Sequence, residues 1–247
     1  MTPMRHTQVL FRVMGASSNK RITVAIDGPA GAGKSTTARR LAERLGYTFL
    51  DTGAIYRSLA LIAQQRSVSW NDGPSLASLA AGLDIRFRSD NRIHRVLLGE
   101  ADVTDQIRTP EISDGASRVS SLPEVRAALL DLQRRLGAGG GVVAEGRDVG
   151  TVVFPNAEAK FFLVANPTER ARRRLLELDG AGQGQPELDE VLREIQARDN
   201  RDSSRTAAPL RRAPDAIEID STAMGPEAVV DHMVEVVRSM GGCSDLP

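Results

Sequence analysis

The stretch Gly28-Pro29-Ala30-Gly31-Ala32-Gly33-Lys34-Ser35 decides the fold of this chain. It satisfies the pattern GxxxxGK[ST] at every fixed position, and it lies between a β-branched run at residues 22–26 and a segment with helical spacing of apolar residues at 35–45. Successive backbone N–H groups can point inward around an anion only where residues without bulky side chains take unusual dihedral angles. The order strand, glycine-rich loop, helix therefore predicts a phosphate cradle at a helix N-terminus.

The side chains at the end of this loop predict a nucleoside triphosphate as the ligand. Lys34 adds a full positive charge near the β- and γ-phosphates, and Ser35 offers its hydroxyl to Mg²⁺. Thr36 and Thr37 fall in the first helical turn, where one of them can reach the α-phosphate. The alternative is a glycine-rich turn without a ligand, but Lys followed by Ser at this spacing gives no folding advantage. The expected ATP-binding residues are Gly28, Pro29, Ala30, Gly31, Ala32, Gly33, Lys34, Ser35 and Thr36.

Four further apolar runs predict the remainder of a buried sheet, at residues 47–50, 142–144, 161–164 and 216–219. Short apolar strands that alternate with helices are typical of an α/β fold with a parallel sheet. We therefore expect a five-stranded parallel sheet flanked by helices. The chain has 247 residues and 41% hydrophobic content, which suffices for one such domain over residues 21–247.

Two stretches interrupt this alternation. Polar and apolar residues alternate at 83–103, which predicts a small antiparallel sheet within an inserted lobe at about 80–138. Residues 172–205 are highly charged and contain glycines 180, 182 and 184 between two helical segments, which predicts a short helical lid at about 172–206. Residues 1–20 have the composition of a flexible N-terminal extension, with Met14 as an alternative start.

The overall composition argues against several classes of protein. The 32 basic and 32 acidic residues balance, so no net field attracts nucleic acid or an anionic membrane, and base-stacking aromatic residues make up only 4%. The single cysteine, Cys243, cannot form an intrachain disulfide or a cysteine zinc site. No apolar run approaches the roughly 18 to 20 residues of a membrane-spanning helix. We expect a cytoplasmic monomer with no signal peptide and no nucleic-acid or membrane partner.

Three further strings discriminate among proteins with a P-loop. The chain lacks an Asn-Lys-x-Asp guanine reader, and it is shorter than most motor or transporter ATPases. It carries instead Leu50-Asp51-Thr52-Gly53-Ala54-Ile55-Tyr56-Arg57, Ala144-Glu145-Gly146-Arg147-Asp148-Val149-Gly150-Thr151 and Arg198-Asp199-Asn200-Arg201-Asp202-Ser203-Ser204-Arg205. From about residue 22 to the last helix, these motifs resemble the bacterial cytidylate kinases. The alternative is a P-loop kinase for another small acceptor, such as adenylate, shikimate or gluconate.

The resemblance implies a P-loop kinase core, an inserted monophosphate-binding lobe and a short lid, with Mg²⁺ and ATP as phosphoryl donor and CMP or dCMP as acceptor. It implies that the acceptor is bound by Thr52, Arg57, Ser117, Arg126, Arg147, Asp148, Arg198, Asp202 and Arg205. Within this set, Ser117, Arg126 and Asp148 would read the cytosine, and Arg198 and Asp202 would hold the ribose. The implied catalytic residues are Lys34, Arg147, Arg201 and Arg205. Thr52 stands where Ser is more frequent in the family.

The chemistry of phosphoryl transfer explains why such a set is rich in arginine. The transition state is loose, so the protein mainly aligns two phosphates and neutralises their spreading charge. The acceptor monoester has a second pKa of about 6 and is already a dianion, so no general base is needed. Arg198, Asp202 and Arg205 would share one face of a persisting helix. Simpler explanations remain for some positions: Thr52 as a helix N-cap, Asp51 as a cap or a water-mediated Mg²⁺ ligand, and the lid charges as a solvated surface.

Overall fold

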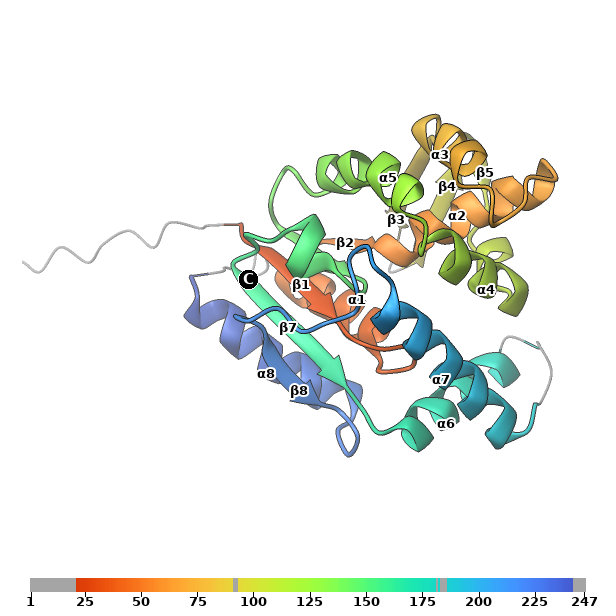
Figure 1. Ribbon diagram of the computed structural model, residues 1–247. Coiled ribbons are helices and arrows are strands. Elements are labelled where there is room, and N and C mark those ends of the chain that lie inside the picture. Colours follow the sequence, from red (N-terminus) through yellow and green to blue (C-terminus); the bar gives the residue numbers. More distant parts are fainter. Residues whose placement is uncertain (1–20, 91–92, 181, 183–185, 242–247) are drawn as a thin grey trace, which may run out of the picture.

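The computed structural model describes residues 21–90, 93–180, 182 and 186–241. Within these ranges, five parallel strands form the central sheet in the order β2-β6-β1-β7-β8 (Figure 1). They are β1 (Thr23–Asp27), β2 (Thr48–Asp51), β6 (Val142–Glu145), β7 (Ala159–Val164) and β8 (Ile217–Asp220). The predicted five-stranded parallel sheet is confirmed, and each strand lies within two residues of its predicted position. The expected extension at 1–20 and Cys243 lie outside the described residues.

The two faces of the sheet are buried by different parts of the chain. Helices α1 (Lys34–Leu45) and α8 (Pro226–Ser239) cover one face, where Leu41 and Met233 pack in a core with Ile26 and Phe161. Because side chains alternate along a strand, Ala25 points to the opposite face. There it packs in a second cluster with the segment that follows β6, which includes the single π-helical turn η2 (Val149–Val153).

A separate apolar core, distinct from the two clusters on the faces of the sheet, belongs to the segment between β2 and β6. It joins α2 (Thr52–Gln65), α3 (Gly73–Ala81), α4 (Pro110–Val119) and α5 (Pro123–Leu136) with a small sheet. Among the described residues, that sheet has three antiparallel strands, β3 (Ile85–Asp90), β4 (Ile93–Leu98) and β5 (Ala101–Asp102), followed by the 3-10 turn η1 (Gln106–Arg108). The predicted small antiparallel sheet is confirmed, and in Figure 1 this segment forms a mass of its own beside the central sheet.

Helices α6 (Pro167–Gly180) and α7 (Leu188–Ser204) pack on each other beyond the carboxyl end of β7 (Figure 1). Ala171 and Leu178 of α6 meet Val191 and Ile195 of α7 in a small apolar cluster. Helix α7 ends at Ser204, and Arg205 follows in extended conformation with φ −63° and ψ 140°. The expectation that the helix persists through Arg205 is therefore wrong at that position, where the Arg205 Nε donates to the Ala208 carbonyl at 2.7 Å. No described helix is both long and apolar enough to cross a membrane.

Candidate active site

The glycine-rich loop between β1 and α1 takes the backbone conformation that its sequence predicts. Gly28, Gly31 and Gly33 have φ values of 146°, 73° and 89°, a range that strongly favours glycine. A Cβ atom on Gly28 would also lie 2.1 Å from the carbonyl oxygen of Leu163 on the neighbouring strand. This close approach requires glycine at position 28, and the loop leads directly into the N-terminus of α1.

The ammonium group of Lys34 is folded back over this loop. Its Nζ donates to the carbonyl of Pro29 at 2.7 Å, and the residue is only 5% exposed. Burial, together with the charge of Arg147, lowers the pKa of Lys34 to about 7. The side chain thus pays a desolvation cost that an anion on the loop would offset.

A buried carboxylate that the sequence analysis did not select lies beside Ser35. The Ser35 Oγ donates to Oε1 of Glu145 at 2.6 Å, and Glu145 ends strand β6, which lies between β2 and β1. Burial and the neighbouring Asp51 raise the pKa of Glu145. A hydroxyl and a carboxylate next to a phosphate loop are oxygen ligands of the kind that Mg²⁺ uses together with substrate phosphates. An acid at the carboxyl end of a predicted buried strand was the signal available in the sequence.

Asp27 is a second buried carboxylate that the motifs did not mark. It ends β1, and its two carboxylate oxygens accept from the backbone N–H groups of Val149 and Gly150, each at 2.8 Å. Burial raises the pKa of Asp27 to about 6, although these hydrogen bonds oppose the shift. Asp27 therefore fixes the turn that carries Arg147 and Asp148 next to the phosphate loop.

The start of α2 brings three polar side chains together. Asp51 caps the helix by accepting from Ala54 N–H at 2.9 Å and also accepts from Nη2 of Arg57 at 2.6 Å. The Thr52 Oγ1 donates instead to the carbonyl of Glu145 at 2.8 Å. The cap at this helix is therefore Asp51, and the alternative that placed it at Thr52 is wrong. The Nε of Arg57 is buried and has no hydrogen-bond partner among the described residues.

Arg126, Asp148 and Arg205 form a buried cluster although they come from three separate parts of the chain. The Arg126 guanidinium donates to Asp148 and, at 3.2 Å, to the carbonyl of Ser120. The Arg205 Nη2 lies 3.4 Å from the other carboxylate oxygen of Asp148. Ser117 faces no partner within the described chain, and its Oγ is buried. Arg126 also lines a pocket of about 200 Å³.

Arg147, Arg198 and Asp202 form an adjoining cluster. The Nε of Arg147 donates to Asp202 Oδ2 at 2.9 Å. Burial opposes ionisation of Asp202, but Arg147, Arg198 and Arg205 outweigh it and lower the pKa of that carboxyl group. Burial and Arg147 lower the pKa of Arg198 to about 10, and its buried Nε lacks a hydrogen-bond partner within the described part of the chain. Guanidinium groups thus outnumber carboxylates here.

Arg201 is the one predicted site arginine that the structure directs elsewhere. Its Nη1 donates to Asp114 Oδ1 at 3.0 Å, and 37% of its side chain is exposed. This ion pair joins α7 to α4, so Arg201 connects the helix pair α6–α7 with the segment between β2 and β6. Of the other predicted residues, the phosphate loop, Thr52 and Arg147 follow the carboxyl ends of β1, β2 and β6, whereas Ser117, Arg126, Arg198 and Asp202 come from helices α4, α5 and α7.

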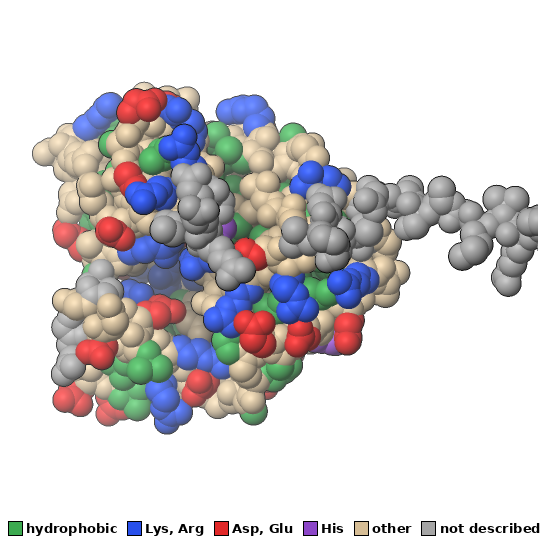
Figure 2. All heavy atoms as spheres, turned by 180° about the vertical axis from the view of Figure 1, so that it is seen from behind, with side chains coloured by type: hydrophobic (Ala, Val, Ile, Leu, Met, Phe, Trp, Pro, Cys, Tyr) green, Lys and Arg blue, Asp and Glu red, His purple; other side chains and the backbone are tan. Residues whose placement is uncertain are grey.

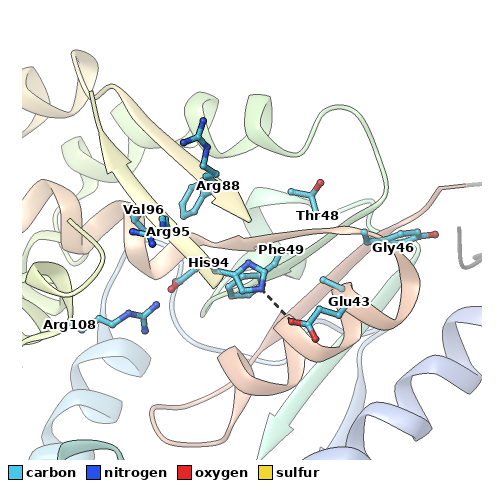
Figure 3. A pocket seen from close by; sticks show the side chains of 13 residues that line it. Glu43, Gly46, Thr48, Phe49, Arg88, His94, Arg95, Val96 and Arg108 are labelled. Carbon is cyan, nitrogen blue, oxygen red and sulfur yellow. Dashed lines mark ion pairs between the residues drawn. The ribbon is translucent and has the colours of Figure 1, made fainter. Parts of the chain in front are cut away.

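The surface between these parts of the molecule is hollowed. Figure 2 shows Lys and Arg side chains gathered in a hollow between the two masses of the visible face. A pocket of about 390 Å³ opens between α1, β2 and the β3–β4 ribbon and reaches Asp51 and Arg108 (Figure 3). At its lower side His94 approaches Glu43, with 3.7 Å between Nε2 and Oε1, and stacks edge-on against Phe49. His94 of β4 thus packs against α1 and β2, although no spacing in the sequence marked it.

A protein-family model described as cytidylate kinase matches residues 24–239. The chain belongs to the cytidylate kinase family. It is 51% identical over 219 residues to a cytidylate kinase of Syntrophotalea carbinolica. This match covers 89% of this chain and 93% of the relative. It is 50% identical over 225 residues to a cytidylate kinase of Geobacter sulfurreducens, covering 91% of this chain and 96% of that protein. The resemblance stated from the sequence motifs is confirmed.

Proposed function

We propose that this member of the cytidylate kinase family transfers the γ-phosphate of ATP to CMP or dCMP, giving CDP or dCDP. The observation that carries the proposal is the meeting of a phosphate loop with a surplus of buried guanidinium groups at one edge of the sheet. Arg57, Arg147 and Arg198 come from separate elements, and the proposal is supported by the effect of Arg147 and Arg198 on the pKa of Lys34 and of Arg57 on that of Arg198. Such an arrangement matches two phosphoryl groups that face each other.

The donor side of the site suits a triphosphate. Its charge would offset the desolvation of Lys34 and would accept hydrogen bonds from the amides of the loop at the start of α1. Ser35 and Glu145 offer a hydroxyl and a carboxylate for Mg²⁺, and the lone pairs of the Ser35 Oγ stay available to a metal ion while its hydrogen is donated to Glu145. When bound, the metal ion neutralises charge that develops on the phosphates.

The proposed acceptor side contains buried polar atoms that lack hydrogen-bond partners among the described residues. A buried donor without a partner costs about 1–3 kcal/mol, so a ligand that satisfies it gains affinity. The Nε atoms of Arg57 and Arg198 and the Oγ of Ser117 are such atoms within the described chain. Phosphate oxygens suit the two guanidinium groups, and an edge of a base suits the hydroxyl.

The pair of Arg126 and Asp148 supplies the chemistry that separates cytosine from uracil. The cytosine edge carries an amino donor at C4, whereas uracil carries an acceptor there. A carboxylate accepts from the amino group but repels the uracil oxygen. Because Arg126 and Arg205 both contact Asp148, they fix the direction in which its carboxylate points. Asp202 accepts from Arg147 and lies near Arg198. There Asp202 and Arg198 would bind a ribose hydroxyl of the acceptor.

We further propose that helices α6 and α7 act as a lid and that residues 80–138 contain the monophosphate-binding lobe. The small core shared by Ala171 and Ile195 supports movement of the two helices as one unit. Helix α7 carries Arg198 and Asp202, so its closure would bring both over the acceptor. No proton acceptor is required in this arrangement, because the acceptor phosphate reacts as a dianion.

The proposal is tested by measuring ADP release with ATP, Mg²⁺ and a panel of nucleoside monophosphates. We expect CMP and dCMP to be the best acceptors. The variant Arg126→Ala should raise KM for CMP by about 100-fold, since removing a partner from a buried charged pair costs about 3 kcal/mol. KM for ATP should change less than about threefold. Equal changes for both nucleotides would contradict cytosine reading, and AMP or shikimate as the best acceptor would overturn the proposed substrate.

A further inference from the structure

The outer side of the phosphate loop is held by an ion pair that none of the nucleotide contacts above uses. Backbone N–H and carbonyl groups of a loop that packs against other parts of the chain need hydrogen-bond partners. Arg170 is 6% exposed, and its Nη1 donates to the carbonyl of Ala30 at 3.0 Å and to Asp199 Oδ2. Asp199 Oδ1 in turn accepts from the N–H of Ala30 at 3.2 Å. One ion pair therefore binds both backbone groups of the same loop residue.

The backbone of the loop lies directly against Arg170. A Cβ atom on Gly31 would be 2.9 Å from the Arg170 carbonyl oxygen and 3.0 Å from its Cβ. The Nε of Arg170 is also committed, because it donates to the carbonyl of Ala165 at 3.0 Å at the end of β7. The guanidinium thus connects the sheet, the phosphate loop and helix α7 through three separate contacts.

Helix α7 places Asp199 between the residues that face the acceptor. Arg198 precedes it directly, and Asp202 follows three positions later in the same turn. Asp199 touches the donor loop, while Asp202 holds Arg147 at 2.9 Å. One turn of helix therefore contacts the donor side and the acceptor side at once, and neither contact can change its position without moving the other.

We propose that Arg170 and Asp199 are positioning residues that couple the donor site to the acceptor site. This inference rests on the proposed transfer from ATP to CMP. A triphosphate that orders the loop at Ala30 orders Asp199 and hence holds Arg198 and Asp202 in place over the acceptor. Because in-line transfer tolerates little displacement, loss of the ion pair lowers the rate of transfer more than it weakens binding of either nucleotide alone.

The test measures how a non-hydrolysable ATP analogue changes the affinity for CMP, by calorimetry, together with kcat and both KM values. The variant Asp199→Asn keeps an oxygen for the Ala30 N–H but loses the ion pair. We expect it to lower kcat at least about tenfold. Displacing reacting groups by one ångström can lower the rate roughly 100-fold, and a smaller displacement should lower it less. We also expect it to abolish the effect of the analogue on CMP affinity, with KM for ATP changing less than threefold. Glu194→Gln, an exposed carboxylate on the same helix, is the matched control and should behave as wild type.

A second variant covers the case in which Asp199→Asn fails to fold. Arg170→Lys keeps the charge but cannot hold Ala30 and Asp199 with a planar fork. It should show the same loss of coupling, and the double variant Asp199→Asn/Arg170→Lys should be no worse than either single one. Folded variants in which the analogue still raises CMP affinity as in the wild type would overturn the proposal, whatever their kcat. Absence of CMP-dependent ADP release by the wild type would instead overturn the proposed function.

Discussion

The carboxyl group of Asp27 makes the stability of the protein depend on pH. Its pKa is about 6 in the folded protein against an ordinary value of 3.8. Between these values the folded protein binds more protons than the unfolded chain, so the free energy of unfolding falls as the pH rises through this range. The difference of about two units corresponds to roughly 3 kcal/mol.

The variant Asp27→Asn removes this titration. We expect the free energy of unfolding of the wild type, measured relative to that of the variant by urea denaturation, to fall by up to about 3 kcal/mol between pH 3 and pH 7. The variant itself loses part of the support of the Val149 and Gly150 amides at every pH. Curves for the two proteins that stay parallel across this range would contradict the shifted pKa of Asp27.

The lowered pKa of Lys34 predicts that the protein takes up a proton when it binds ATP. With a pKa of about 7 in the free protein, its amine is mostly neutral at pH 8, and the phosphates of ATP raise the pKa again. Calorimetry at pH 8 in buffers of different ionisation enthalpy should therefore report uptake of up to about one proton. In Lys34→Arg the guanidinium is charged throughout, so the uptake should disappear. Equal proton numbers for both proteins would argue against a neutral Lys34.

The residues that we propose as ligand contacts were easier to select from the sequence than the buried groups that support them. The motif strings include Lys34, Ser35, Arg147 and Asp202, because phosphate chemistry demands these side chains at fixed spacing. Asp27 and Glu145 were not selected, although both end buried strands. Their partners are a distant backbone turn and the hydroxyl of Ser35, and such partners become visible only when the sheet order is known.

At the scale of elements, the strand–loop–helix unit depends on its first glycine. In Gly28→Ala the new methyl group would meet the backbone carbonyl of Leu163 at 2.1 Å, and backbone on the adjacent strand cannot give way as a flexible side chain does. We expect a loss of more than about 2 kcal/mol in the free energy of unfolding, and loss of ATP binding. Gly180→Ala is the matched control, since a Cβ there meets no described atom within 4 Å and should stabilise the end of α6 slightly. Equal stability of both variants would refute this reading of the loop.

The alternation of apolar runs was sufficient to predict the five central strands but not the helices between β2 and β6. Alternating residues near 83–103 marked the β3–β4 ribbon, because a half-exposed antiparallel pair has a clear period of two. Helices α4 and α5 do carry a helical period, because Ile112, Ala116 and Val119 of α4 and Val125 and Leu129 of α5 are buried at helical spacing, so the sequence held a signal for both helices that the alternation of strands did not use. The end of α7 before Arg205 was also not predicted, since the chain turns there through a contact with the Ala208 carbonyl.

At the scale of the whole molecule, the hollow seen in Figure 2 predicts closure around two nucleotides. We expect the radius of gyration in small-angle scattering to decrease when CMP and a non-hydrolysable ATP analogue are both present. Either nucleotide alone should have a smaller effect, because helix α7 contacts both sides of the site. Scattering profiles that are identical with and without the two nucleotides would exclude such closure.

The order β2-β6-β1-β7-β8 has a consequence for how the chain folds as it is made. The first strand lies in the middle of the sheet, and both of its neighbours are translated more than 110 residues later, as the pairing of Thr23 with Val142 and of Val24 with Ala159 shows. On the ribosome, the nascent glycine loop is therefore exposed until Arg170, Asp199 and finally Ser221 arrive to bind its outer backbone. The loop that follows the first described strand is therefore among the last to gain its supporting contacts, and a product truncated before Arg170 lacks all three.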